Sequence, residues 1–597
     1  MAVFKVRYFS YVSAVFCFFL FSDISQVNAQ APIQAQWSSR GYGADGPWPA
    51  VEVTVGSDSK LALFPGRPFQ TFVISTDYCR LNISEGCYAS MAGTYNRAQS
   101  EMERTGSDMG IRFSPPHKES MLGMSVRGGD FVSWVDSADI GHARVADSSL
   151  VLIESQMMAY PGGQWYPMSA GCLGVGGPSA INQSFTTGTY PINATLIPGR
   201  LWERGDVPSN SFGLHIGSMQ PPLGGSLWFG GYDKNRVIGD VLVTATSFHE
   251  APITLRDISL EVVQGASPFT FDTKQDNLLT ANNDTMGSAL PVYVDGCSPY
   301  LTLPKSTCDN IASHLPVIYD SGLGLYLWNT SDPYWPLVVS SASVLAFTFL
   351  ASSNTETLVV RVPFSHLNLT LTAPLVNGDP KPYFPCFTGG DGLYTLGRAF
   401  LQDAFLGANW NQDKWFVAQA PGPKVQASPD VVAIQESDEA IESGSNDWAA
   451  SWDGFWKVLT PDEVDVGPAS TGLNTETASP PGDDTAGDGG GLSTGAMAGI
   501  GAAAGAVVLA FLAAGFLLWR KRKARAGSSK RQQPVDANLN GCHEDGVVKG
   551  PGGYRYGNPA ELRDTSPPSV VRELDGNAQW PQHEGDDNNG PRTHELA

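Results

Sequence analysis

Basic residues are scarce in this sequence. Lysine and arginine together number 37, against 59 aspartates and glutamates, so the formal net charge is −22. Such a chain would repel the phosphates of a nucleic acid, and we therefore expect no nucleic-acid partner. Charged residues of both signs make up only 16%, whereas glycine (65) and proline (42) are plentiful. This composition is typical of a loop-rich β protein, and 597 residues leave room for two or more domains.

The signatures of two hydrolase classes are also missing. The nine histidines include no His-Glu-x-x-His pair, so the sequence predicts neither a metal site nor a cofactor. A serine hydrolase would need a Gly-x-Ser-x-Gly turn, and residues 442–445 (Glu-Ser-Gly-Ser) do not supply it. If the chain is an enzyme, its chemistry must come from other groups.

Apolar runs occur near both ends of the chain. Residues 1–29 are predicted to be a signal peptide, because Lys5 and Arg7 precede a short apolar core that ends at small residues. Residues 495–519 are long enough to span a bilayer, and a basic cluster follows at once. We expect a single-pass type I protein of the plasma membrane, anchored by this one helix, with its ectodomain outside the cell and residues 520–597 as a disordered cytoplasmic tail.

An acidic stretch precedes this span. Residues 425–492 are rich in Asp, Glu, Ser, Gly and Pro, and Lys457 is their only basic residue, which predicts a disordered stalk. Trp448, Trp452 and Trp456 recur in it at helical spacing. This spacing favours a short helix docked on the preceding domain over contact with an anionic membrane. Two Gly-x-x-x-Gly motifs in the span permit helix pairing, but the oligomeric state stays open.

Cysteines and glycosylation sequons agree with this topology. Cys17 lies in the signal peptide and Cys542 in the tail, which leaves an even number of cysteines outside the cell. The Asn-x-Ser/Thr sequons also fall outside, and we expect them to be glycosylated. They are Asn82, Asn182, Asn193, Asn283, Asn329 and Asn368.

The centre of the ectodomain holds a carboxylate between two apolar runs. Residues 293–304 read Tyr-Val-Asp-Gly-Cys-Ser-Pro-Tyr-Leu-Thr-Leu-Pro, which predicts a strand, a tight loop that carries Asp295, and a returning strand. This stretch resembles the second active-site loop of the pepsin-like aspartic proteases. Other stretches resemble later landmarks of that family in the right order: the glycine-rich 171–179, the Phe-Gly-Gly-Tyr-Asp of 229–233 and the Leu-Gly-Arg-Ala-Phe-Leu of 396–401.

The resemblance covers about residues 48–420 and implies an all-β, bilobal fold with a substrate cleft between the lobes. Within an ectodomain of residues 30–424, the N-lobe would span about 48–210 and the C-lobe about 211–424. The relatives imply a disulfide between Cys308 and Cys386. Cys79 and Cys87 would close a small loop, and Cys172 and Cys297 are left as a remaining pair.

The first active-site loop departs from the family pattern. Pepsin-like enzymes activate a water with two carboxylates that share a proton, one from each lobe. In residues 70–79, Ser75 is assigned to the first aspartate position and Asp77 to the place of the following glycine. A serine hydroxyl cannot serve as the partner base. Asp77 is a weak candidate for that role, because catalysis tolerates little displacement.

Two further departures concern the flap and the second loop. The family closes its cleft with a hairpin that carries a tyrosine, yet no tyrosine occurs between Tyr95 and Tyr160. Asp295 is followed by Gly296 and Cys297 instead of Thr-Gly, so the threonine contacts that join the two loops are expected to be broken.

We therefore expect a catalytically degenerate pseudoprotease. It would act at the cell surface as a binding or sensing module, with a peptide, a protein or a cell-wall polymer in its cleft. The combination of a substituted first loop and a membrane anchor resembles that of membrane-anchored pepsin-like proteins of filamentous fungi. One alternative is an active acid aspartic endopeptidase that processes surface or secreted proteins with Asp295 and an unrecognised second group. Another is a purely adhesive or structural surface protein.

Overall fold

The computed structural model describes residues 30–465, apart from short internal segments at 81–86, 101–110, 114–117, 188–189, 245–251, 284–286 and 351–356. The predicted signal peptide, Asn82, the span at 495–519 and the tail lie outside these residues. Among the described residues, every helix is too short or too polar to cross a membrane.

A ten-stranded sheet contains most of the strands in the first half of the chain. Alternation of side chains along its strands explains their formation: Val51–Val55 reads Val-Glu-Val-Thr-Val, with the valines buried and Glu52 exposed. The strands are β2 (Gln36–Trp37), β3 (Val51–Val55), β4 (Ser59–Gly66), β5 (Thr71–Ile74), β6 (Ile111–Phe113), β8 (Phe131–Ile140), β9 (Ala143–Ile153), β12 (Gly171–Gly174), β13 (Ile181–Thr187) and β14 (Tyr190–Thr195).

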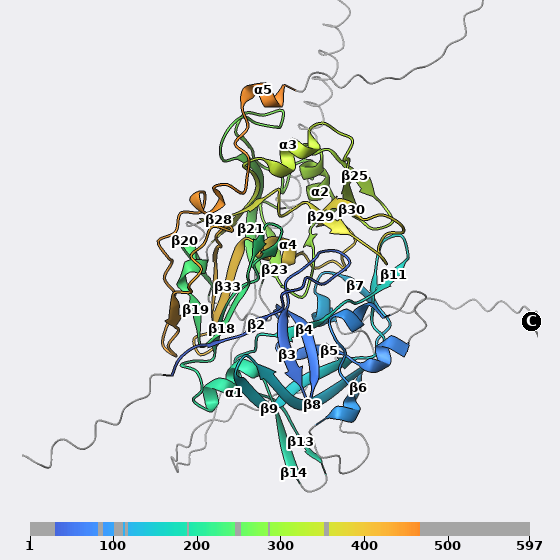
Figure 1. Ribbon diagram of the computed structural model, residues 1–597, viewed down its shortest axis with the longest axis vertical. Helices are drawn as coiled ribbons and strands as arrows, with labels where there is room; N and C mark the ends of the chain where they lie inside the picture. The colour runs from blue at the N-terminus through green and yellow to red at the C-terminus, as the bar shows by residue number, and fades with distance from the viewer. Residues whose placement is uncertain are drawn as a thin grey trace, which may run out of the picture. The chain divides into compact units, whose positions relative to one another are not determined.

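An eight-stranded sheet forms from the second half of the chain. Figure 1 shows β3, β4, β5, β8 and β9 gathered in one part of the molecule, and β21 and β23 in another. The strands of this second sheet are β21 (Ile253–Val262), β22 (Lys274–Gln275), β23 (Leu290–Val294), β24 (Leu301–Thr302), β27 (Ser343–Leu350), β28 (Thr357–Pro363), β31 (Cys386–Phe387) and β32 (Thr395–Leu396).

A third sheet joins segments from the start, the middle and the end of the folded region. Its six strands run in the order β1-β18-β15-β33-β34-β20. They are β1 (Ile33–Gln34), β15 (Ser211–His215), β18 (Ser226–Phe229), β20 (Ile238–Thr244), β33 (Ala404–Asn409) and β34 (Lys414–Gln419).

The remaining elements are short. A three-stranded sheet consists of β7 (Ser125–Arg127), β10 (Met157–Ala159) and β11 (Trp165–Pro167). Two two-stranded sheets pair β16 (Ser218–Met219) with β17 (Pro222–Leu223) and β19 (Gly231–Asp233) with β35 (Val431–Ala433). A four-stranded sheet consists of β25 (Val317–Asp320), β26 (Leu325–Trp328), β29 (Leu369–Leu371) and β30 (Lys381–Phe384). The α-helices are α1 (Ile197–Glu203), α2 (Lys305–Ala312), α3 (Trp335–Ser340), α4 (Arg398–Leu401) and α5 (Pro461–Val464). The described chain is thus mostly β-strand, as the sequence predicts.

The same strand arrangement occurs once in each of the two large sheets. In the first, β12 lies between β4 and β5, parallel to β4 and antiparallel to β5. In the second, β32 lies between β23 and β24, again parallel to the first and antiparallel to the second. The connection from β4 to β5 is therefore the structural counterpart of the connection from β23 to β24, which carries Asp295.

The predicted start of the disordered stalk at residue 425 is wrong. Residues 425–465 are described and pack on the preceding body: β35 pairs with β19, and Ile434 is buried in a cluster with Tyr232 and Phe405. Trp452 is fully buried, and it stacks on Trp456 with ring centroids 5.7 Å apart. Acidic composition alone predicted disorder, but these apolar side chains supply enough buried surface to fix the segment.

The structure shows how the cysteines pair and how exposed the asparagines of the sequons are. The structure joins Cys79 to Cys87, Cys172 to Cys297 and Cys308 to Cys386, the pairs given by the sequence analysis. Among the sequons, two asparagines are exposed on the β13–β14 hairpin and three others are partly buried, and their glycosylation stays a prediction. The exposed ones are Asn182 and Asn193, and the partly buried ones are Asn283, Asn329 and Asn368.

Candidate functional site

Asp295 follows β23 directly, and its side chain is fully buried. Its Oδ1 accepts backbone N–H bonds from Cys297 at 3.0 Å and from Arg67 at 2.9 Å. Its Oδ2 accepts a weaker bond from the Ser298 hydroxyl at 3.4 Å. Burial raises the pKa of Asp295 above its ordinary value, and the amide bonds from Arg67 and Cys297 and the charges of Arg67 and Arg398 only partly offset that rise.

The chain that faces Asp295 is the end of β4. A side chain at Gly66 would collide with Asp295 Oδ1 and with the Cys297 sulfur, and one at Gly296 would collide with the Pro65 carbonyl. The two loops therefore touch through backbone, which only glycine permits at this separation. The first-half loop offers Asp295 the amide N–H of Arg67, a donor that cannot act as a base.

Ser75 and Asp77 lie elsewhere, which corrects their assignment to the first active-site loop. Ser75 follows β5, the returning strand, and its amide donates to the Ile153 carbonyl at 3.0 Å. Asp77 lies at the surface, where it pairs with Arg80 at 2.9 Å and Arg97 at 3.3 Å. In the repeated strand arrangement the counterpart of Asp295 falls at Pro65–Gly66.

The apolar run that begins at residue 70 has the pattern of a strand that enters the loop, but β4 enters the loop and β5 leaves it. A usable signal was present: Leu61-Ala-Leu-Phe followed by Pro65-Gly66 and a second apolar run repeats the strand–loop–strand pattern around Asp295.

Residues 120–124, here called the cover segment, close the site from the first half of the chain. The Ser298 hydroxyl donates to the Leu122 carbonyl at 2.6 Å. Ser120, Met121, Leu122 and Met124 are all buried. A Cβ at Gly123 would lie 2.6 Å from the Thr395 hydroxyl on β32, so this segment lies directly against β32 of the second sheet.

Other contacts hold the two halves together beside the cover segment. The hydroxyls of Tyr160 and Tyr300 are 2.8 Å apart in a buried hydrogen bond. The amide of Gly162 donates to the Gly322 carbonyl at 2.8 Å. The disulfide between Cys172, on β12, and Cys297, in the Asp295 loop, adds a covalent connection.

Arg398 supports the Asp295 loop through its carbonyl groups, and the sequence alone did not point to it. Its guanidinium donates to the carbonyls of Gly296 at 3.0 Å and Cys297 at 2.9 Å, and it lies 3.8 Å from the centre of the Phe64 ring. Asp45 Oδ2 is 4.0 Å away. Burial lowers the pKa of Arg398, although the negative charge of Asp45 opposes that change. The signal was a single arginine within the apolar run of residues 394–401.

Among the described residues, no group of three or more His, Cys, Asp or Glu side chains is placed to hold a metal ion. What the site offers is a protonatable carboxyl, held by amides and a hydroxyl and shielded from solvent.

Comparisons with known proteins found a likeness among solved structures alone. No family model matches the chain, and no curated protein matches it. Among solved structures, an aspartic proteinase from Irpex lacteus is similar at 14% sequence identity, over 65% of this chain and 97% of that chain, with a TM-score of 0.39.

Proposed function

We propose that the protein is a pepsin-like pseudoprotease, a cell-surface module that binds or senses and no longer cleaves peptides. The observation that carries this proposal is the environment of Asp295. Its Oδ1 is shared by the amides of Arg67 and Cys297, and a second carboxyl is not among its hydrogen-bonding partners in the described residues.

The chemistry of the family explains why this environment matters. Aspartic proteases need one carboxylate as base and a second carboxylic acid close to it, because two such groups share a proton and polarise the water between them. Here the opposing position offers an N–H group, and burial raises the pKa of Asp295. A single carboxyl with no second acid–base group opposite it does not activate water for attack on an amide.

The pepsin-like fold is supported by two independent features. Family landmarks occur in order along residues 48–420, and the strand–loop–strand arrangement with an inserted third strand is repeated in both large sheets. Such a repeat is what a bilobal protein with one loop from each lobe requires.

The proposal also includes a membrane anchor for the protein and a ligand for its cleft. The apolar runs at 1–29 and 495–519 support a type I plasma-membrane protein with the folded region outside the cell. A peptide, protein or wall polymer in the cleft would have to displace the cover segment from Ser298, since the Leu122 carbonyl occupies that hydroxyl.

A proteolysis assay tests the proposal. The full-length protein in detergent is incubated with an unfolded protein at pH 3–6, with and without a statyl transition-state mimic. We expect cleavage no faster than that of Asp295→Ala at any pH. Asp77→Ala serves as the matched variant, because Asp77 is an acid of the same region paired with Arg80 at the surface.

One result would overturn the proposal in favour of an active acid endopeptidase. This is cleavage that the statyl compound inhibits, that Asp295→Ala abolishes and that Asp77→Ala leaves intact. Loss of activity in both variants would also contradict the proposal, because it would assign a catalytic role to Asp77.

A further inference from the structure

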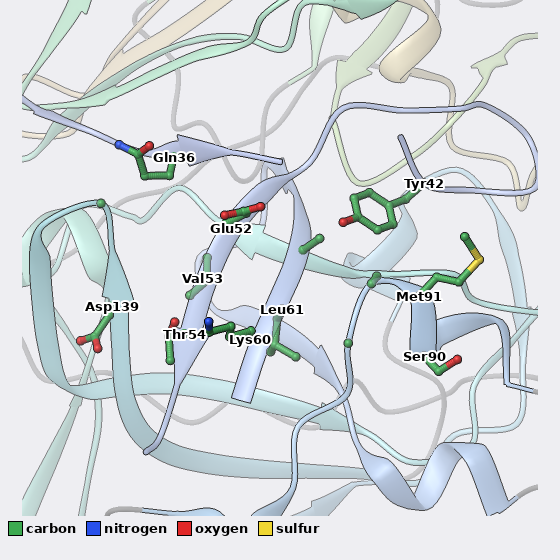
Figure 2. A pocket seen from close by; sticks show the side chains of 14 residues that line it. Gln36, Tyr42, Glu52, Val53, Thr54, Lys60, Leu61, Ser90, Met91 and Asp139 are labelled. Atoms are coloured by element: carbon green, nitrogen blue, oxygen red, sulfur yellow. The ribbon is translucent and has the colours of Figure 1, made fainter. Parts of the chain in front are cut away.

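A hollow of about 640 Å³ lies on the outer face of the ten-stranded sheet, and none of its lining residues belongs to the Asp295 loop. This volume falls within the range of roughly 300–1,000 Å³ that is usual for small-ligand sites. Figure 2 shows Asp139 on one side of it, Ser90 and Met91 on the other, and Thr54 and Lys60 between them.

The floor of the hollow is built from β3 and β4. The two strands are antiparallel, with Glu52 opposite Ala62 and Thr54 opposite Lys60. Because alternate side chains of a strand point to the same face, these four side chains face outward together while the valines of β3 face the core. The floor therefore presents a carboxylate, a hydroxyl and an ammonium group side by side.

The walls stand on either side of this floor. Gln36 on β2 pairs with Glu52, and Asp139 on β8 pairs with Thr54. The opposite wall is the turn after the 3₁₀ helix Tyr88–Met91, where the Ala62 amide donates to the Ala92 carbonyl at 2.7 Å. Gly93 has a φ of +88°, and a side chain there would collide with the Lys60 carbonyl, so this wall is fixed close to β4.

Several polar groups of the hollow are available for a ligand, whereas Asp139 is already paired with Arg144 at 3.0 Å. Among the described residues, Glu52 and Lys60 form no ion pair, and the side chains of Gln36 and Thr54 form no hydrogen bond. Met91 is 69% exposed and offers an adaptable apolar contact at the rim. A second hollow of about 170 Å³ shares Tyr42 and Met91 with the first and extends toward Thr372 and Ala373, so the site is elongated.

Several ligand classes do not fit this surface. An extended peptide would need an unpaired strand edge, but β3 is paired with β2, β4 and β8, and β4 with β3 and β12. A polyanion would be repelled by a chain of net charge −22. A lipid or other apolar ligand would leave the carboxylate and ammonium of the floor without partners.

We propose that this hollow binds a neutral, linear oligosaccharide. Hydroxyl groups both donate and accept, so they match a floor and walls that combine an acceptor (Glu52), a donor (Lys60) and groups that do both (Gln36, Thr54). The C–H faces of the sugar rings find the exposed Met91 thioether at the junction of the two hollows. The elongated shape fits several sugar units in a row.

Binding is tested by calorimetry with the full-length protein in detergent. The probes are cellohexaose, laminarihexaose and chitohexaose as neutral linear sugars, a galacturonic acid hexamer as the anionic counterpart, and an uncharged hexapeptide. We expect at least one neutral hexamer to bind with a Kd below 1 mM, and the anionic hexamer and the peptide to bind at least tenfold more weakly.

Variants connect binding to the hollow. Glu52→Gln removes the charged acceptor of the floor, and Thr54→Trp fills the hollow from a half-exposed position, so each is expected to weaken binding at least tenfold. Asp240→Asn, at an exposed position of β20 in the six-stranded sheet that lines neither hollow, is the matched control and should bind as the unaltered protein does. Thermal unfolding of each variant shows that it is folded.

The proposal is overturned by any of three results. These are failure of all the neutral hexamers to bind, tighter binding of the anionic hexamer or the peptide, and sugar binding that both Glu52→Gln and Thr54→Trp leave unchanged. The outcome is independent of whether the protein cleaves peptides, because no residue of the Asp295 loop lines the hollow.

Discussion

At the scale of single residues, Asp295 acts as a structural group. Its carboxyl accepts the amide N–H bonds of Arg67 and Cys297 and so ties the two loops together. Arg398 holds the same loop from the other side through the carbonyls of Gly296 and Cys297. The loop is therefore held by backbone contacts that need no catalytic partner.

Asp295→Asn is expected to change how stability depends on pH. Because burial raises the folded-state pKa of Asp295 above its ordinary value of 3.8, the protonated acid stabilises the fold below that value. This contribution is lost as the pH rises through the folded-state pKa. The stability of the unaltered protein should therefore fall relative to Asp295→Asn as the pH rises, with a slope of at most about 1.4 kcal/mol per pH unit.

Urea unfolding of both proteins between pH 3 and pH 8 measures this difference. Ser75→Ala is the control, because a serine is buried there and does not titrate in this range. Its stability difference from the unaltered protein should stay constant with pH. A difference for Asp295→Asn that is flat, or that rises in the opposite direction, would contradict the raised pKa.

Sequence reasoning found Asp295 but not its surroundings. A lone acid between two apolar runs is a local pattern, and local patterns are visible in a sequence. The approach of Gly66 and Arg67 to Asp295 joins residues 228 positions apart, and nothing in the spacing of either segment predicts that contact. Arg398 was missed for the same reason, since its partners lie about a hundred positions earlier.

At the scale of elements, residues 425–465 form a strap along the body. Asn409 Nδ2 donates to the Gln435 carbonyl at 2.9 Å, and the Ser451 hydroxyl accepts the Gly422 amide at 2.7 Å. Trp452 lies against His366, with ring centroids 4.8 Å apart. Composition averaged over the whole acidic stretch hid these short apolar pieces, so the sequence predicted the docked tryptophans but not the ordered chain around them.

Trp452→Ala tests the contribution of the strap. The indole is fully buried, and truncation of such a side chain typically costs about 3–5 kcal/mol of unfolding free energy. Phe455, in the same segment, is 44% exposed, so Phe455→Ala should change stability by no more than about 0.5 kcal/mol. Urea unfolding of the two variants gives the comparison. Equal effects would show that the strap is not docked through Trp452.

At the scale of the whole molecule, specific contacts close the two halves against each other beside Asp295. The cover segment, the Tyr160–Tyr300 hydrogen bond and the Cys172–Cys297 disulfide all cross between them. The mostly-β architecture was predictable because strand alternation and glycine-rich turns repeat along the chain. The contacts between the two halves were not predictable, because they depend on residues from both halves that meet only after folding.

Removal of the disulfide between the halves should be costly. Cys172 and Cys297 are separated by 125 residues, and in the chain-entropy account a long loop gains most from a crosslink, so the Cys172→Ala, Cys297→Ala pair is expected to lose about 2–5 kcal/mol. The control is the Cys79→Ala, Cys87→Ala pair, whose loop spans only 8 residues and should lose less. Denaturant unfolding under oxidising conditions measures both. A larger loss from the short loop would contradict this ranking.

The six-stranded sheet also determines when the chain can finish folding during its synthesis. Its first strand, β1, is made at the start of synthesis, yet β15 finds its second neighbour only when β33 has been made. Until the ribosome has passed residue 409, β15 presents an unpaired edge, the kind of surface that chaperones hold and that aggregates form on. A chain that terminates prematurely before this point should therefore be retained and degraded inside the cell, whatever the fate of its earlier domain.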